Sequence, residues 1–214
     1  DDLKEHNASA DQIKDVSCDM SKAFIKGVEN NLPKADITFD RFHIMKIINI
    51  AVNDVRKQEA QTQSILKDSR YVFLKNEKNL TDKQRQKRQE ISMSKLNLKS
   101  MKALHIRESF QEIYSAPVPE LFESRLKEWY FWATHSRIQP IIEAAHTIKE
   151  HWNGVLNWNK SRINNGLLEG LNSLIQAAKA KARGFRSFRC FRIVAFLITG
   201  KLNFTQFNEN YLPV

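Results

Sequence analysis

The chain lacks most of the features that identify common classes of protein. It has only two cysteines, Cys18 and Cys190, which lie far apart in apolar surroundings and are expected to be reduced, buried thiols of a cytoplasmic protein. The longest apolar run, Ile193–Ile198, is much shorter than the roughly 20 residues that a membrane-spanning helix needs. No signal peptide is visible. The sequence therefore disfavours a secreted, disulfide-stabilised protein and predicts no membrane partner.

Motifs of the common cofactor sites are missing as well. The sequence has no phosphate-binding P-loop and no dinucleotide-binding fingerprint. His146 and His151 are separated by five positions, and no cysteine or further histidine joins them at the spacing of zinc ligands. We therefore expect neither a zinc site nor a bound nucleotide cofactor.

Positive charge is what the chain has in excess. Its 214 residues include 34 Lys and Arg against 24 Asp and Glu, a formal net charge of +10. Such an excess favours a polyanionic partner, because contacts to phosphates release condensed counterions. The basic residues cluster late in the chain, which favours nucleic acid over the alternative of a merely soluble basic surface.

The first 60 residues have the pattern of an α/β domain. The segments Ile13–Cys18 and Ala35–Phe39 are predicted strands, each followed by a predicted helix, Ser21–Asn30 and Arg41–Ala60. Strand–helix–strand–helix order predicts a parallel strand pair in a layered α/β structure.

Strand signals stop after residue 60, so the fold class is α/β but mostly α. Residues 61–160 are expected to form a large all-helical insertion, and residues 161–204 to complete the core with two helices. Residues 205–214 are expected to be a tail. The predicted helices after residue 60 are Thr81–Ser94, Leu96–Ser115, Glu120–Ser136, Arg137–Trp158, Asn165–Arg183 and Ser187–Asn203.

Two aspartates follow the predicted strands. Asp19 and Asp40 each stand between a strand and a helix, where open α/β sheets bind ligands. If the strands are neighbours, the two carboxylates lie close together, and His43 lies one helical turn after Asp40. The alternative is that both aspartates only cap helices. Ser21 could cap the first helix equally well, so that role does not require Asp19.

Glu169 lies on the polar face of the helix predicted at 165–183, about 150 residues after Asp19. Carboxylates brought together from distant segments are how proteins hold Mg²⁺ beside a phosphodiester. The alternative is an ordinary amphipathic helix with a solvated polar side. The polar face consists of Asn165, Glu169, Asn172, Gln176, Lys179 and Arg183.

A basic run follows in the region 179–192, where arginines alternate with phenylalanines. Phe185, Phe188 and Phe191 are expected to pack inward while the cations follow a phosphate backbone. The alternative is a basic helix that contacts nothing. The expected DNA-binding residues are Asn172, Gln176, Lys179, Lys181, Arg183, Arg186, Arg189 and Arg192.

Two other functions are open on this evidence. The last two helices, joined through Gly184, could form a non-catalytic DNA-binding module of the helix-turn-helix kind. An incomplete sheet with an exposed edge could also pair with another copy, which predicts a homo-oligomer or a self-associating remnant.

Five segments, in order along the chain, resemble the ISL-three family of bacterial insertion-sequence transposases. These segments are Ser17–Ser21, Phe39–His43, Arg70–Asn76, Asn165–Ser173 and Gly184–Phe188. The resemblance implies a ribonuclease-H-like catalytic core of the DDE type with a helical insertion. This chain would contain part of that core.

By this resemblance, Asp19 matches the second catalytic aspartate and Glu169 the catalytic glutamate, and both would bind Mg²⁺ or Mn²⁺. Asp40, His43 and Asn165 would form a secondary site. The implied activity is DNA strand cleavage and strand transfer, with transposon ends and target DNA as partners. The family's first aspartate lies on an earlier strand, upstream of where this chain begins. We therefore expect the chain to be the carboxy-terminal part of a longer protein and to be nearly inactive alone.

Overall fold

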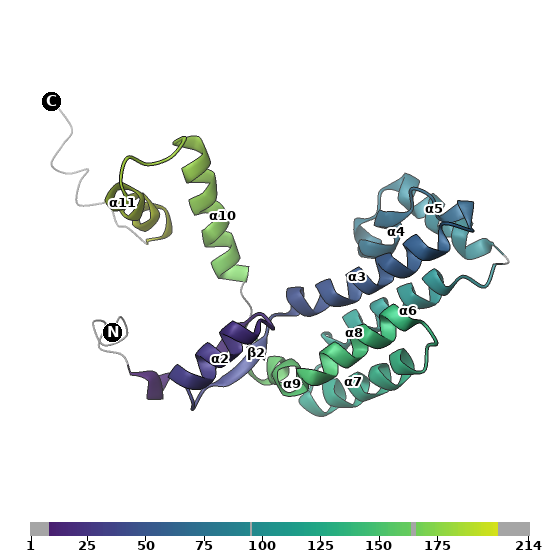
Figure 1. Ribbon diagram of the computed structural model, residues 1–214, viewed down its shortest axis with the longest axis horizontal. Helices are drawn as coiled ribbons and strands as arrows, with labels where there is room; N and C mark the ends of the chain where they lie inside the picture. Colours follow the sequence, from purple (N-terminus) through teal and green to yellow (C-terminus); the bar gives the residue numbers. More distant parts are fainter. Residues whose placement is uncertain (1–8, 95, 164–165, 201–214) are drawn as a thin grey trace. The chain divides into compact units, whose positions relative to one another are not determined.

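The computed structural model describes residues 9–94, 96–163 and 166–200. It is mostly helical, with one small parallel sheet (Figure 1). Contacts divide the chain into two compact units, unit 1 (1–163) and unit 2 (164–214). Among the described helices, none combines the length and the apolar character needed to cross a membrane. The elements are η1 (Ala10–Gln12), β1 (Asp15–Cys18), α2 (Lys22–Asn31), β2 (Asp36–Phe39), α3 (Arg41–Glu59), η2 (Ser64–Leu66), α4 (Arg70–Leu74), η3 (Glu77–Asn79), α5 (Asp82–Met93), α6 (Lys99–Ile113), α7 (Pro119–Thr134), α8 (Gln139–Glu150), α9 (Trp152–Ser161), α10 (Gly166–Lys181) and α11 (Phe188–Thr199).

The parallel strand pair predicted from the sequence is confirmed. Strands β1 and β2 pair in parallel with Val16 opposite Ile37 and Cys18 opposite Phe39, and α2 connects them. β2 is partly apolar and becomes fully buried towards its carboxyl end, where Phe39 is 5% exposed. The α/β character of the chain is therefore limited to this short sheet, and helices form the rest of unit 1.

Helix α3 joins the sheet to the helical part of unit 1. It packs against α6 and α8, and α4 and α5 surround the end of α3 that is remote from β2 (Figure 1). The side of α3 that faces these helices carries Ile44, Ile48 and Val52, which are at most 1% exposed. Their spacing of four residues places them on one helical face, which explains how the sequence specifies this packing.

The core of unit 1 is continuous and rich in aromatic residues. Phe110 makes edge contacts with Trp129 and Tyr114, at ring-centroid distances of 4.6 and 5.7 Å. The indole of Trp129 donates a hydrogen bond to the carbonyl oxygen of Ile106 at 2.9 Å, so its polar group is satisfied inside the core. The largest fully buried side chains are Phe73, Phe110, Phe122, Ile44, Ile48, Leu66, Ile91, Leu104, Ile106, Leu126, Ile141 and Ile148.

The helix expected at 137–158 is instead two helices, and this expectation was wrong. Helix α8 ends and α9 begins at His151, whose backbone lies at φ −108° and ψ 23°. The ring of His151 contacts that of Phe39 edge-on at 5.0 Å. The break allows α8 to pack on α3 while α9 packs on β2. The apolar spacing continues across both helices, so it did not indicate the break.

The sequence-based division at residue 60 stays a prediction. In the structure, residues on both sides of it share one core, because α3 packs against α6 and α8 within unit 1.

Candidate functional site

The two strand-end aspartates lie at the same end of neighbouring strands. Asp19 directly follows Cys18, Asp40 directly follows Phe39, and these two preceding residues are partners in the parallel register. The amide of Asp40 donates to the carbonyl oxygen of Cys18 at 3.1 Å, which extends the strand pairing to this point. The predicted proximity of the two aspartates at one sheet end is therefore confirmed.

Asp19 does not cap helix α2. The N-cap is Ser21, and the Ser21 side chain makes no capping hydrogen bond. The Asp19 Oδ1 atom accepts a hydrogen bond from the amide of Ser21 at 2.7 Å, and no described residue donates to its other oxygen. The carboxylate is half-buried, and its negative charge adds to the effect of burial in raising the pKa of Cys18. Asp19 thus offers a carboxylate oxygen at the carboxyl end of a parallel strand.

Asp40 has a structural role in helix α3. It is only 4% exposed, and its Oδ1 atom accepts a hydrogen bond from the amide of Phe42 at 2.7 Å, which makes it the N-cap. Burial raises the pKa of the nearby Tyr114 phenol, the positive charge of Arg41 lowers it, and the Asp40 carboxylate raises it further. The helix-capping alternative is therefore confirmed for Asp40. His43, one turn later, is half-buried and contacts the Phe42 ring edge-on at 5.8 Å.

Helix α10 in unit 2 carries the predicted polar face. Asn172, Gln176 and Lys179 are exposed on it, while Leu171 and Ile175 on the apolar side are half-buried. Glu169 is exposed in the first turn of α10, where a carboxylate also complements the helix dipole. Asn165, which the sequence places at the start of this face, lies outside the described residues.

The cations that follow α10 are accessible. Arg183 and Gly184 adopt positive φ angles of 53° and 106°, and they end the helix. Ser187 begins α11 by accepting a hydrogen bond from the amide of Cys190 at 3.3 Å. All of the predicted DNA-binding side chains are exposed: Asn172, Gln176, Lys179, Lys181, Arg183, Arg186, Arg189 and Arg192.

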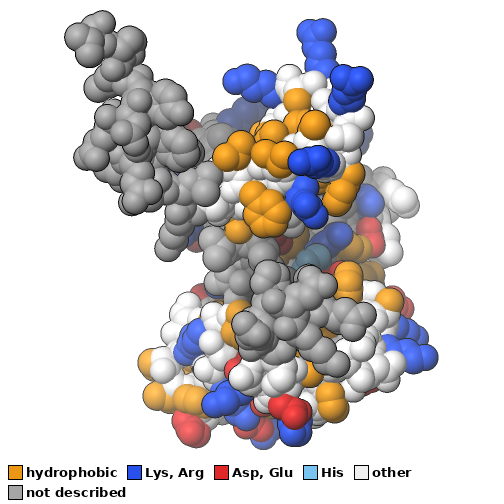
Figure 2. Space-filling model, turned by 90° about the vertical axis from the view of Figure 1, so that its left-hand side faces the viewer, with side chains coloured by type: hydrophobic (Ala, Val, Ile, Leu, Met, Phe, Trp, Pro, Cys, Tyr) orange, Lys and Arg blue, Asp and Glu red, His pale blue; other side chains and the backbone are white. Residues whose placement is uncertain are grey.

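Two expectations for α11 were wrong. Cys190 is exposed rather than buried, and Phe188, expected to pack inward, is 75% exposed. Phe185 and Phe191 are half-buried and contact each other at a centroid distance of 5.4 Å. Figure 2 shows Lys and Arg side chains beside exposed hydrophobic side chains on the surface of this molecule. Burial of these phenylalanines would need a packing surface that α10 and α11 do not form by themselves.

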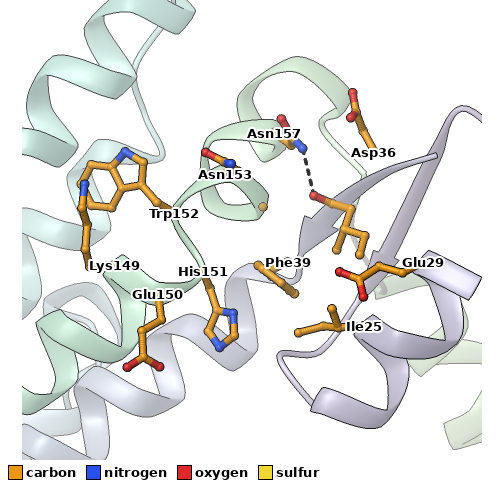
Figure 3. Close-up of a pocket in the computed structure, with 12 residues that line it drawn as sticks. Ile25, Glu29, Asp36, Phe39, Lys149, Glu150, His151, Trp152, Asn153 and Asn157 are labelled. Atoms are coloured by element: carbon orange, nitrogen blue, oxygen red, sulfur yellow. Dashed lines mark hydrogen bonds between the residues drawn. The ribbon is translucent and has the colours of Figure 1, made fainter. Parts of the chain in front are cut away.

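Helix α9 covers the outer edge of β2, a feature that sequence patterns did not indicate. The Asn157 side chain donates to the carbonyl oxygen of Ile37 at 3.0 Å (Figure 3). A Cβ atom on Gly154 would overlap the Phe39 ring, so the backbone of α9 packs closely on β2 at this point. A cavity of about 440 Å³ lies beside this contact, between α2, β2 and the start of α9. Because α9 occupies this side of β2, further strands in register could join the described sheet only beside β1.

Carboxylate oxygens are suitable ligands for Mg²⁺, so Asp19 and Glu169 have the right chemistry for a metal site. Neither described unit contains enough of these ligands by itself. Within residues 9–94, 96–163 and 166–200, no group of three or more His, Cys, Asp or Glu side chains is arranged to hold a metal ion. Asp19 belongs to unit 1 and Glu169 to unit 2, and the two units are described separately.

A family model described as "Transposase", that of the ISL3 transposases, matches residues 1–195, which is most of the chain. The chain belongs to the ISL3 transposase family. This assignment agrees with the resemblance of the strand-end and α10 motifs noted above.

Curated transposases are similar to this chain over part of their length. The transposase for insertion sequence element IS1001 from Bordetella parapertussis is 26% identical over 191 residues, which cover 86% of this chain and 47% of that protein. The transposase for IS1557 from Mycobacterium tuberculosis is 30% identical over 132 residues, which cover 62% of this chain and 29% of that protein. The chain thus spans about half, or less, of the curated relatives that it matches. No solved structure matches it significantly.

Proposed function

We propose that this chain contains part of the catalytic region of a DNA transposase that cuts transposon ends and joins them to target DNA. The observation that carries the proposal is Asp19, a half-buried carboxylate at the end of a parallel strand, in a chain that matches the ISL3 family over residues 1–195. The net charge of +10 supports DNA as the substrate.

In this proposal, Asp19 and Glu169 are metal ligands for Mg²⁺ or Mn²⁺, and the two units meet so that both carboxylates reach the same site. Divalent ions, when bound, would activate the attacking water or 3′-hydroxyl and stabilise the leaving oxygen. A further carboxylate would come from a strand that pairs with the open edge of β1. The sheet would then be the ribonuclease-H-like core that the family resemblance implies. Because α9 covers the outer edge of β2, the additional strands would pair on the β1 side alone.

The chain's other residues would bind and orient DNA. Asn172 and Lys179 share the exposed face of α10 with Glu169, so they would hold the phosphate backbone near the reacting phosphodiester. Asp40 would act indirectly, by fixing the start of α3 beside Asp19, and His43 would contact DNA from the first turn of that helix. The remaining proposed backbone contacts are Gln176, Lys181, Arg183, Arg186, Arg189 and Arg192, with Asn165 beside the site.

The test is an excision assay with the protein expressed from its own gene together with a marked copy of its element. We expect Asp19→Asn and Glu169→Gln each to reduce excision at least roughly a hundredfold, because charge stabilisation by a metal contributes several kcal/mol. Asp15→Asn is the matched control for Asp19, since Asp15 lies exposed at the opposite end of β1. Glu143→Gln, on an exposed position of α8, is the control for Glu169.

Excision at the level of the controls in either variant would rule out the catalytic assignment. DNA binding that is indifferent to Mg²⁺ and to Glu169→Gln would then favour the alternative, a non-catalytic DNA-binding module formed by α10 and α11.

We also propose that the protein is a homo-oligomer. Exposed apolar side chains on α11, including Phe188, Phe196 and Leu197, support this, because a buried interface would remove them from water. Light scattering of the purified protein tests it, and a single monomeric mass at micromolar concentration would contradict it.

A further inference from the structure

Two cations, Arg70 and Lys75, flank the Tyr71 ring near the end of α3 that is remote from the strand-end aspartates, and the charge of Arg70 also acts on a third cation, Arg56. We call Arg56, Arg70, Tyr71 and Lys75 the Tyr71 patch. The Tyr71 ring is 54% exposed, with the Arg70 guanidinium 5.8 Å and the Lys75 ammonium 5.5 Å from its centroid. Figure 1 shows α4, which carries Arg70 and Tyr71 and is directly followed by Lys75, beside α5 and the last turns of α3.

The cations of the patch are paired with neutral groups only. Arg56 donates through two nitrogens to the Asn53 Oδ1 atom at 3.1 and 3.0 Å, and Lys75 donates to the Gln84 Oε1 atom at 3.4 Å. In the part of the chain that the structure describes, no carboxylate forms an ion pair with Arg56, Arg70 or Lys75.

Neighbouring cations on α5 differ in this respect. Three of the four Lys and Arg side chains on α5 lie within ion-pair distance of a carboxylate: Arg85 with Asp82, Lys87 with Glu90, and Arg88 with Glu108. Lys83 is the exception and forms no ion pair with a described residue.

Like charges within the patch repel each other. Partial burial lowers the pKa of Arg56, and the positive charge of Arg70 lowers it further. Holding two guanidinium groups close together without an anion is electrostatically unfavourable. Cations that serve only solubility would not need to be held together in this way, whereas a bound phosphate would relieve the repulsion.

A rigid scaffold holds the patch in place. Val72 and Phe73 anchor α4 in the core, at 1% and 0% exposure. The buried Arg107 side chain donates to the carbonyl oxygen of Leu74 at 2.9 Å and to the Asn76 Oδ1 atom at 3.0 Å. Arg107 thereby holds the Leu74 backbone just before Lys75 and the Asn76 side chain just after it, so the cations are presented from an anchored segment.

We propose that the Tyr71 patch binds the phosphate backbone of duplex DNA, as a contact separate from the C-terminal cations. This proposal rests on the proposed function, in which DNA is the substrate. Residues 67–88 contain eight Lys and Arg against three Asp and Glu, so the surrounding segment has the complementary charge. Two cations already interact with the Tyr71 ring, so Tyr71 positions them for phosphate contact and does not stack on a base.

The location of the patch predicts where it touches DNA. Helix α3 has 19 residues and separates the patch from Asp40 at its start. At 1.5 Å per residue this is roughly 28 Å. A duplex lying along α3 would therefore meet the patch about eight base pairs from the strand-end aspartates, at 3.4 Å per base pair.

The experiment compares the parent protein with Arg70→Gln/Lys75→Gln and with a matched double variant, Arg125→Gln/Lys127→Gln. The control also removes one Arg and one Lys, from exposed positions of α7, which packs on α6, α8 and α9. Fluorescence anisotropy with a labelled duplex of about 30 base pairs and arbitrary sequence is measured from about 50 to 200 mM NaCl, in EDTA so that no strand is cut. Circular dichroism melting verifies that each variant is folded.

We expect Arg70→Gln/Lys75→Gln to bind roughly tenfold more weakly at about 150 mM salt, with the slope of log K against log salt reduced by about two. The α7 control should match the parent in both quantities. If the two double variants bind duplex equally, whether both bind more weakly than the parent or both bind like it, the Tyr71 patch does not bind DNA. That result leaves the proposed function intact. If the parent protein binds no duplex at all, both the DNA-binding role of the patch and the proposed function are contradicted.

Discussion

Unit 1 and unit 2 use the same helical patterns with opposite results for burial. Residues 9–163 enclose a continuous core, whereas no residue of 166–200 with a described side chain is buried. In unit 1, each amphipathic helix faces others that complement it: α3 faces α6 and α8, and α7 faces α6, α8 and α9. Among the described residues of unit 2, the contacts are those between α10 and α11.

The difference shows that an amphipathic pattern specifies a face but not the partner that covers it. On α11, Phe188 is 75% and Phe196 66% exposed, although their spacing is that of a buried stripe. Helices of 16 and 12 residues are marginally stable alone in water. We therefore expect the stability of unit 2 to depend on contacts beyond this pair of helices, as the proposal that it joins a catalytic core and an oligomer requires.

The largest expected effect is on the core of unit 1. Phe110→Ala removes a fully buried ring that contacts Tyr114 and Trp129, and it should lower the free energy of unfolding by about 3–5 kcal/mol. Phe196→Ala, on the exposed side of α11, should change it by less than about 0.5 kcal/mol. Urea denaturation followed by circular dichroism measures both values.

The contrast would break if Phe196→Ala destabilised the protein as much as Phe110→Ala. In that case α11 would be buried against another surface in solution, and the two units would not differ in the way described above.

Two helical glycines sharpen the comparison. A Cβ atom on Gly154 of α9 would overlap the Phe39 ring and lie 3.2 Å from the carbonyl oxygen of Ile37, so Gly154→Ala should cost about 1–3 kcal/mol. A Cβ on Gly170 of α10 would meet no atom within 4 Å. Gly170→Ala should therefore stabilise unit 2 by up to about 1 kcal/mol, through helix propensity. Thermal melts of both variants give the sign of each change, and a neutral Gly154→Ala would mean that α9 does not pack closely on β2.

The smallest effect concerns the two thiols. Cys190 on α11 is exposed, whereas Cys18 on β1 is half-buried, and its pKa is raised by burial and then by the negative charge of Asp19. A chromogenic disulfide reagent at about pH 8 should modify Cys190 several times faster, because the thiolate is the reactive form. The rate for Cys18 should rise only at higher pH, as its proton is lost.

Asp19→Asn provides the control for this measurement. Removing the negative charge should lower the pKa of Cys18 and speed its reaction while leaving Cys190 unchanged. If the rate for Cys18 does not respond, the Asp19 carboxylate is not directed towards the end of β1 as described.

Local sequence patterns were sufficient for most of the secondary structure. Alternation in 35–39, a spacing of three and four in 41–60, and the Thr81 cap predicted β2, α3 and α5 within one residue of their observed ends. Each depends on interactions within one segment. Thr81, for example, accepts from the amide of Gln84, and Gln84 in turn accepts from the amide of Thr81.

Features that depend on contacts between distant residues were not predicted from the sequence. The helix break at His151 follows from the packing of α9 on β2, more than 100 residues earlier in the chain, and the coverage of the β2 edge by Asn157 depends on the same contact. The exposure of Cys190 and Phe188 has a similar origin, since burial is decided by whether another surface covers the helix. For the candidate site, the sequence placed Asp19 and Asp40 correctly at adjacent strand ends, and their pairing with Glu169 stays a prediction.

The sequence alone determined where both strands and most of the helices lie, which acids end the strands, and that positive charge dominates, because hydrogen bonding along the chain and side-chain periodicity are local properties. Only the tertiary structure decided that Asp40 is a buried helix cap while Asp19 keeps an oxygen without a hydrogen-bond donor among the described residues. It also decided that Arg70 and Lys75 flank the Tyr71 ring, and that neither they nor Arg56 form an ion pair with a carboxylate of the described residues. These outcomes depend on which surfaces meet, and burial and electrostatic pairing between distant segments are fixed only when the helices pack.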